Sequence, residues 1–104
     1  MPDDQGHPAL NEIELGTVLT ALADPTRRRV VKALLEDADG AERLCTSFGL
    51  QLSKATRSHH FRVLREAGLI RQVDRGNSRM AQLRRRDIEK CFPGLLELIA
   101  RETN

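Results

Sequence analysis

The stretch of sequence that decides the fold is residues 52–69, which read LSKATRSHHFRVLREAGL. Ser53 can cap the start of a helix, because its hydroxyl accepts a hydrogen bond from a first-turn N–H group. Gly68 can end that helix, because glycine adopts the left-handed conformation without a Cβ clash. Phe61 and Leu64 share one face at helical spacing, and we expect them to face the core. The stretch therefore predicts one helix with both ends marked.

The opposite face of this expected helix is small, polar and basic. At helical spacing it carries Ala55, Ser58, His59 and Arg62. No acidic residue precedes Glu66, which lies near the far end. A helix that enters a DNA groove needs this kind of face, with little bulk and many hydrogen-bonding groups. Since His59 and His60 point about 100° apart on a helix, we do not expect them to share a metal ion. We expect His60 to be partly buried, with a backbone partner.

Basic side chains gather around this stretch, although the net charge of the whole chain is only +2. Residues 53–86 hold ten basic and two acidic side chains, residues 1–52 five and nine, and residues 87–104 two and four. A basic block on an acidic body is the electrostatic pattern of a phosphate-binding surface. An isolated basic run would more simply be a solvated face, but this block contains the deciding helix, which favours phosphate binding.

Length and composition exclude several classes of protein. The 104 residues have room for one modest core. The chain shows no long apolar run and no leader sequence, so we expect a cytoplasmic protein. Its two cysteines, Cys45 and Cys91, do not make a disulfide framework. With three phenylalanines and no Trp or Tyr, the chain is poorly suited to stack the bases of single-stranded nucleic acid.

The chain is expected to begin with an arm and a helix. Residues 1–12 are polar and contain two prolines, so we expect a flexible arm with His7 on its surface. Residues 13–23 carry a wide aliphatic stripe, which predicts a helix.

Residues 24–36 predict a second helix. Asp24 suits its N-cap and Pro25 its first turn, where a missing N–H group does no harm. Residues 27–29 are three arginines in that first turn, where the helix dipole disfavours cations. They either contact phosphate or pair with acids such as Asp24, and the sequence favours neither alternative.

The segments on either side of the deciding helix complete a motif. Residues 41–48 predict a short helix, which with a following turn and the deciding helix makes a helix-turn-helix. Residues 69–74 and 79–83 predict the two strands of a hairpin. The hairpin tip bears Arg75, Asn77, Ser78 and Arg79. These groups suit contact with backbone phosphates or a minor groove beside the helix, whereas a tip taken alone would be an ordinary exposed turn.

Residues 87–101 are expected to be helical again, with Pro93 starting the last helix. Two terminal helices rich in aliphatic residues exceed what a chain of this length needs for its own core, so we expect a homodimer built on them. The stripe of the first helix could equally cover its own core. The expected interface residues are Leu15, Val18, Leu19, Leu95, Leu96, Leu98 and Ile99.

These features resemble the ArsR/SmtB family of bacterial winged helix-turn-helix repressors. The resemblance covers about residues 14–100 and rests on three blocks. They are residues 21–28 (ALADPTRR), residues 53–69, and the hairpin with Arg75 and Gly76. The resemblance implies a mainly α fold with a small β-hairpin, dimeric through its first and last helices.

The same resemblance implies how the chain meets DNA. Residues 13–104 would form one winged helix-turn-helix domain for DNA binding and dimerisation, behind the arm. The recognition helix, about residues 53–67, would lie in the major groove of operator DNA. The wing, about residues 70–83, would lie on the adjacent backbone or minor groove. Members of the family usually release DNA when an effector binds.

Two positions depart from the family pattern. Arg57 stands where the family usually has an aliphatic residue in the recognition helix, so we expect it to reach a phosphate or an acid. Thiolate metal sites of the family use a Cys-X-Cys pair, whereas here Cys45 is paired with Ser47. One thiolate does not chelate a soft ion, and the last helix has glutamates but no histidine. We therefore expect no metal or cofactor, and a core position for Cys45.

The sequence thus predicts a DNA-binding transcriptional regulator, a repressor by resemblance, that acts as a homodimer on double-stranded operator DNA. The residues expected to bind DNA are Lys54, Thr56, Arg57, Ser58, His59, Arg62, Arg75, Asn77 and Arg79. The alternative is a dimeric protein-interaction module that reads DNA weakly or not at all. We expect no enzymatic activity, because no nucleophile–base set, phosphate loop or metal cluster is present. The effector, or a partner protein in its place, stays open.

Overall fold

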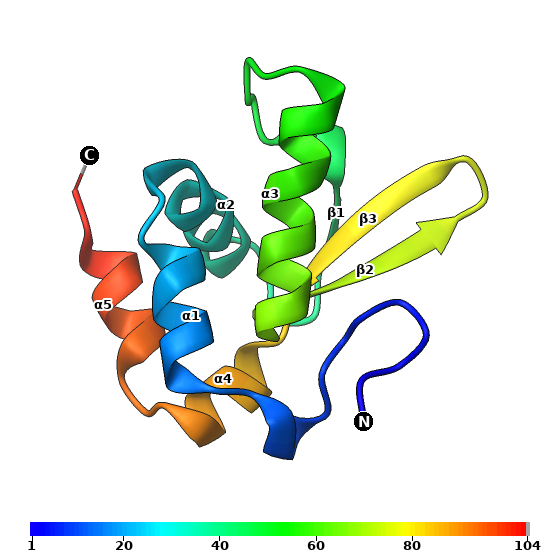
Figure 1. Ribbon diagram of the computed structural model, residues 1–104. Helices are drawn as coiled ribbons and strands as arrows, with labels where there is room; N and C mark the ends of the chain where they lie inside the picture. The colour runs from blue at the N-terminus through cyan, green and yellow to red at the C-terminus, as the bar shows by residue number, and fades with distance from the viewer. Residues whose placement is uncertain (104) are drawn as a thin grey trace.

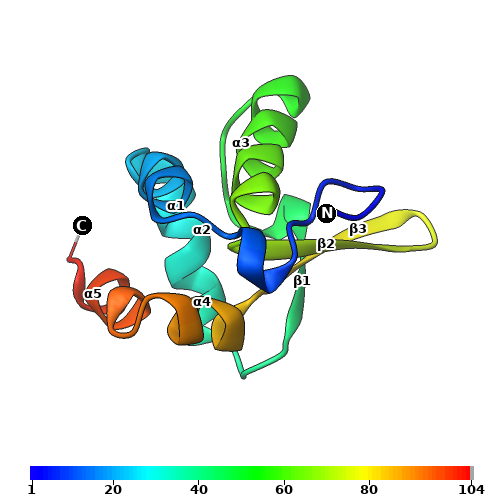
Figure 2. The same ribbon diagram turned by 60° about the horizontal axis from the view of Figure 1, so that its bottom comes forward.

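Five α-helices and a three-stranded antiparallel sheet make up the fold that the computed structural model describes for residues 1–103 (Figure 1). The helices are α1 (Leu15–Leu22), α2 (Pro25–Glu36), α3 (Lys54–Ala67), α4 (Arg85–Cys91) and α5 (Leu95–Arg101). The strands are β1 (Glu42–Leu44), β2 (Ile70–Arg75) and β3 (Ser78–Leu83), and single 3-10 turns occupy Leu10–Glu12 and Cys45–Ser47. The sheet order is β1-β3-β2, and the β2–β3 hairpin projects from the helical body as a wing (Figures 1 and 2). The expected winged helix-turn-helix fold is confirmed.

Helix α3 begins and ends where the local signals predict. The Ser53 hydroxyl accepts a hydrogen bond from the backbone N–H of Thr56 at 3.1 Å, and Gly68 follows the helix with a φ of 89°. Phe61 and Leu64 are 1% and 0% exposed, so the predicted apolar face is confirmed. The core lies where this face meets α1, α2 and the base of the wing.

The short helix predicted over residues 41–48 is wrong. The chain there forms β1, which pairs with β3 in the register Glu42 to Gln82, followed by the 3-10 turn. Eight residues gain little as an isolated helix. As a third strand, residues 42–44 pair with the backbone groups of β3 that would otherwise form an open edge of the sheet. The first helix of the expected helix-turn-helix is therefore reduced to one turn, Cys45–Ser47, ahead of α3.

Within residues 1–12, His7, Pro8 and Leu10 contact β2, Arg84 and Cys91, whereas residues 1–5 are exposed. The flexibility expected of this arm stays a prediction. His7 is 6% exposed, so its predicted surface position is wrong. Its Nε2 atom accepts a hydrogen bond from the backbone N–H of Gln72 at 3.0 Å, while its Nδ1 atom donates to Asp3 at 2.9 Å. The buried guanidinium of Arg84 donates to the carbonyl of Pro8 at 2.7 Å. These partners lie 65 and 76 residues away along the chain, beyond the reach of any local signal.

Arg28 at the start of α2 pairs with an acid, as one sequence alternative held, but the acid is Glu102, 3.0 Å from its Nε atom, and not Asp24. Arg27 and Arg28 also have a role that neither alternative named. Arg27 Nε donates to the carbonyl of Ala21 at 2.6 Å, and Arg28 Nη1 donates to that of Leu22 at 2.6 Å. Both therefore cap the C-terminal end of α1, where a helix leaves carbonyl groups unpaired and favours cations. The negative end of α1 offsets the unfavourable position of these charges on α2. Asp24 caps α2 as predicted, accepting hydrogen bonds from the N–H groups of residues 26 and 27.

Three of the seven expected dimer-interface residues are buried in the chain's own core. Val18, Leu96 and Ile99 are between 0% and 5% exposed, so their assignment to an interface is wrong. A short helix buries residues that recur three or four apart, and Leu96 and Ile99 share that face of α5, which packs on α2 and α4. Leu95 is half-buried against the same core.

The other three expected interface residues lie on the surface. Leu15 and Leu19 of α1 are each 49% exposed, and Leu98 of α5 is 66% exposed. Both helices lie at the end of the molecule opposite the wing (Figures 1 and 2). No helix within residues 1–103 combines the length and the apolar character needed to cross a bilayer.

Gly68→Ala is expected to lower the free energy of unfolding by about 2–4 kcal/mol, through left-handed strain and overpacking together. A Cβ atom at Gly68 would lie 2.7 Å from Cγ1 of Ile13 and 3.2 Å from Cγ of Pro8. Gly49→Ala is the matched control, because Gly49 has a φ of +70° but no atom within 4 Å of the added Cβ. Urea unfolding followed by circular dichroism measures both, and equal losses would contradict the contact with Ile13.

Candidate nucleic-acid interface

The outer face of α3 is open to solvent over its first turns. Five predicted DNA-binding residues lie on α3 with exposed side chains: Lys54, Thr56, Ser58, His59 and Arg62. The Ser53 hydroxyl donates to Oγ1 of Thr56 at 2.9 Å, which fixes both groups at the helix start. Arg62 Nη2 donates to Nδ1 of His59 at 3.3 Å, one turn away. The face therefore offers hydroxyl, imidazole and guanidinium groups together, with no acidic side chain before Glu66.

A cavity of about 500 Å³ opens between the N-terminal half of α3 and the base of the wing. Arg57 lines it and is half-buried. Sequence reasoning offered a phosphate or an acid as the partner of Arg57. Within residues 1–103 no carboxylate oxygen lies within 4.0 Å of the Arg57 guanidinium, so Arg57 has no acidic partner among these residues. We call this space the α3–wing cavity.

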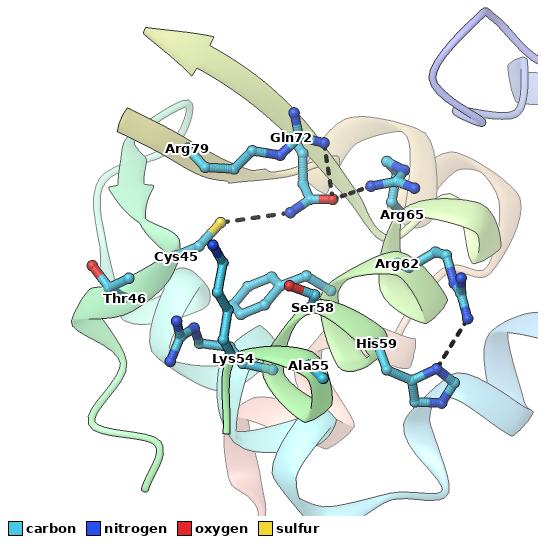
Figure 3. A pocket seen from close by; sticks show the side chains of 12 residues that line it. Cys45, Thr46, Lys54, Ala55, Ser58, His59, Arg62, Arg65, Gln72 and Arg79 are labelled. Atoms are coloured by element: carbon cyan, nitrogen blue, oxygen red, sulfur yellow. Dashed lines mark hydrogen bonds between the residues drawn. The ribbon is translucent and has the colours of Figure 1, made fainter. Parts of the chain in front are cut away.

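Gln72 of β2 connects the wing to α3 at the inner end of the α3–wing cavity (Figure 3). Its Nε2 atom donates to Sγ of Cys45 at 3.6 Å, and its Oε1 atom accepts from Arg65 and, at 3.5 Å, from Arg79. Gln72 and Cys45 are 6% and 7% exposed, which confirms the core position expected for Cys45. Burial raises the pKa of the Cys45 thiol although the Gln72 amide donates to it, which favours the neutral thiol over the thiolate.

Sequence reasoning missed Gln72 and Arg65. The available signal was strand alternation, because Gln72 shares the inward face of β2 with the fully buried Ile70. A polar residue at an inward position of a strand needs buried partners. The sequence does not identify those partners, since Cys45 and Arg79 come from other elements.

The arginines of the wing are held by carboxylates. Arg75 makes two hydrogen bonds to Glu42, with Nε at 3.0 Å from Oε1 and Nη2 at 2.6 Å from Oε2. This side-chain contact lowers the pKa of Glu42. Arg79 Nη1 donates to Asp74 at 2.8 Å. Asn77 is exposed in the two-residue loop at the tip. A phosphate must therefore displace a carboxylate to bind Arg75 or Arg79, whereas the exposed Asn77 is directly accessible. The DNA contacts of these three residues stay predictions.

The two adjacent histidines face different partners. His60 is half-buried as expected, but its Nδ1 atom accepts from Arg27 Nη1 at 3.1 Å rather than from the backbone. His59 is turned to Arg62 on the outer face. In the part of the chain that the structure describes, residues 1–103, no group of three or more His, Cys, Asp or Glu side chains is placed to hold a metal ion.

Four of the likenesses that comparison with known proteins gives are as follows. A family model described as a helix-turn-helix domain matches residues 22–73, which run from the end of α1 into β2 and include all of α3. The uncharacterized HTH-type transcriptional regulator YceK of Bacillus subtilis (strain 168) is 31% identical over 84 residues, which span 79% of this chain and 82% of that protein. The crystal structure of an ArsR family transcriptional regulator, 23% identical, superposes with a TM-score of 0.65 over 81% of this chain and 90% of the other. A "possible transcriptional regulator for arsenical resistance", 28% identical, does so with a TM-score of 0.57 over 83% and 96%.

Proposed function

Because the chain belongs to the helix-turn-helix transcriptional regulators, we propose that it is a repressor of the ArsR type that binds double-stranded operator DNA as a homodimer. Helix α3 enters the major groove, and the wing contacts the adjacent backbone or minor groove. The relatives are named as regulators of transcription and not as enzymes. Its place of action is the cytoplasm, where operator DNA lies.

The observation that carries the proposal is the outer face of α3. Lys54, Ser58 and Arg62 are exposed there, and the first acidic side chain of the helix comes at Glu66. Hydroxyl and guanidinium groups read base edges, and lysine and arginine also neutralise phosphates. The basic block of residues 53–86, with ten basic and two acidic side chains, provides the long-range attraction to DNA.

The homodimer is supported by the exposed leucines at the end of the molecule opposite the wing. Leu15, Leu19 and Leu98 are each at least 49% exposed, although large aliphatic side chains on a surface gain by leaving water. A two-fold interface uses the same patch on both subunits. Such a dimer also matches the symmetry of an operator with two half-sites, one helical turn or a multiple of it apart.

Leu19→Glu is expected to convert the dimer to a monomer, because two carboxylates would be buried in a two-fold contact without partners. Sedimentation equilibrium of the full chain measures the mass. Leu44→Glu is the matched control, since Leu44 is a leucine on β1 that is 42% exposed and away from α1 and α5. The proposed interface is refuted if the wild-type protein is a monomer, or if Leu19→Glu leaves the dimer intact.

The test of the proposed function is binding of purified protein to the DNA upstream of its own gene, by mobility shift and fluorescence anisotropy. Affinity is expected to fall at least about a hundredfold between 50 and 200 mM salt, because bound phosphates release counterions. Added zinc, a chelator and hydrogen peroxide test for an effector in the same assay. Failure to bind any flanking DNA at low salt would instead favour a protein-interaction module.

A further inference from the structure

We propose that the α3–wing cavity is a binding site for a small organic anion with an apolar body, and that this ligand releases the protein from DNA. The existence of the site is independent of the proposed function, whereas the release of DNA rests on it. The argument depends on the charges that line the cavity, on its floor, and on the residues it shares with the outer face of α3.

The charges that line the cavity are of one sign. Its cationic residues are Lys54, Arg57, Arg62, Arg65 and Arg79, and it has no acidic lining residue. Arg79 is paired with Asp74 at 2.8 Å. Within residues 1–103 the other four have no carboxylate oxygen within 4.0 Å. In addition, the Nε atom of Arg65 is buried without a hydrogen-bond partner among these residues. Like charges held this close repel one another, so an anion among them is favoured.

The floor of the cavity carries two apolar side chains beneath the cations. Phe61 and Cys45 line it at 1% and 7% exposure, and the raised pKa of the Cys45 thiol keeps that group uncharged. Gln72 adds one polar amide to the same floor. A volume of about 500 Å³ lies in the range of small-molecule sites. A ligand with an aromatic or aliphatic body and one anionic group matches both the floor and the cations.

The ligand and DNA require the same side chains. Lys54, Ser58, His59 and Arg62 line the cavity and are also predicted to contact DNA (Figure 3). An anion that engages these groups competes with the phosphates and base edges that they would bind. Under simple competition, a ligand present at ten times its dissociation constant raises the apparent dissociation constant for DNA about elevenfold.

The test is isothermal titration calorimetry of the full chain, without DNA, using three probes. They are 2-naphthoate, its neutral isostere 2-naphthamide, and inorganic phosphate. We expect 2-naphthoate to bind at least tenfold more tightly than either of the other two. In a second assay, 2-naphthoate is expected to displace operator DNA, while 2-naphthamide leaves DNA bound.

Two variants locate the site. Arg57→Leu places at this position the aliphatic residue that the resembled family usually has, so it should fold, and it is expected to weaken 2-naphthoate binding at least tenfold. Ala55→Trp fills the cavity from an exposed position of α3 and is expected to abolish 2-naphthoate binding. This variant tests the site independently if Arg57→Leu does not fold. Arg86→Leu is the control, because Arg86 is an exposed arginine on α4 that does not line this cavity.

The outcomes separate the two proposals. Equal affinities for phosphate and 2-naphthoate, or unchanged binding in Ala55→Trp, would overturn the ligand site while leaving DNA binding intact. Binding of 2-naphthoate that does not displace bound DNA would overturn the release of DNA. Specific binding of 2-naphthoate by a protein that binds no DNA would support the site and refute the proposed function.

Discussion

Replacing Arg62 by alanine is expected to raise the dissociation constant for operator DNA at least about a hundredfold, because the proposed dimer would lose one charged hydrogen bond per subunit at roughly 1.5–3 kcal/mol each. Arg62 is exposed on the outer face of α3, and its guanidinium meets His59 at 3.3 Å, so it is held in place before DNA arrives. The slope of log K against log salt should also fall by roughly two units if each Arg62 neutralises one phosphate.

Fluorescence anisotropy with a labelled duplex at several salt concentrations measures both effects. Arg86→Ala serves as the control for charge, because it removes an exposed arginine from α4 and not from α3. Since Arg62 is exposed, its replacement should change the free energy of unfolding by less than about 0.5 kcal/mol. If Arg86→Ala lost as much affinity for DNA as Arg62→Ala, Arg62 would contribute only to the overall positive charge and would make no specific contact.

Phe61→Ala is expected to lower the free energy of unfolding by about 3–5 kcal/mol, a large part of the stability of a domain of this size. Phe61 is 1% exposed on the inner face of α3, and its ring centroid lies 5.6 Å from that of Phe48. Arg43 in turn lies over the Phe48 ring, with Cζ 4.6 Å from its centroid. Removal of the Phe61 ring therefore leaves a cavity under α3 and detaches the turn that precedes the helix.

Urea unfolding at a fixed protein concentration measures this change, because the stability of the proposed dimer would depend on concentration. Phe92→Ala is the matched control: Phe92 is only half-buried and packs at the edge of the core, so we expect a smaller loss. Phe61→Leu should recover part of the stability, since it refills some of the volume. If Phe61→Ala lowered the free energy of unfolding by less than about 1 kcal/mol, the Phe61 ring would not be central to the core.

The candidate site was predictable where its signals are local. The Ser53 cap, the Gly68 stop and the 3.6-residue period place α3 and decide which of its faces is outward, because each involves residues no more than four apart. Exposure of Lys54, Ser58 and Arg62 follows from that period. The α3–wing cavity was not predictable, since its floor brings together Cys45, Phe61 and Gln72 from three different elements.

By itself, the sequence determined the helices that carry their own caps, the hairpin after α3 and the side of α3 that faces solvent. Only the tertiary structure decided that residues 42–44 extend the sheet, that His7 is buried against β2, and that the arginines of α2 cap α1. It also decided that Val18 belongs to the core while its neighbour Leu19 faces solvent. The physical reason is that an apolar or charged side chain needs a partner, but its pattern along the chain does not say which distant element supplies one.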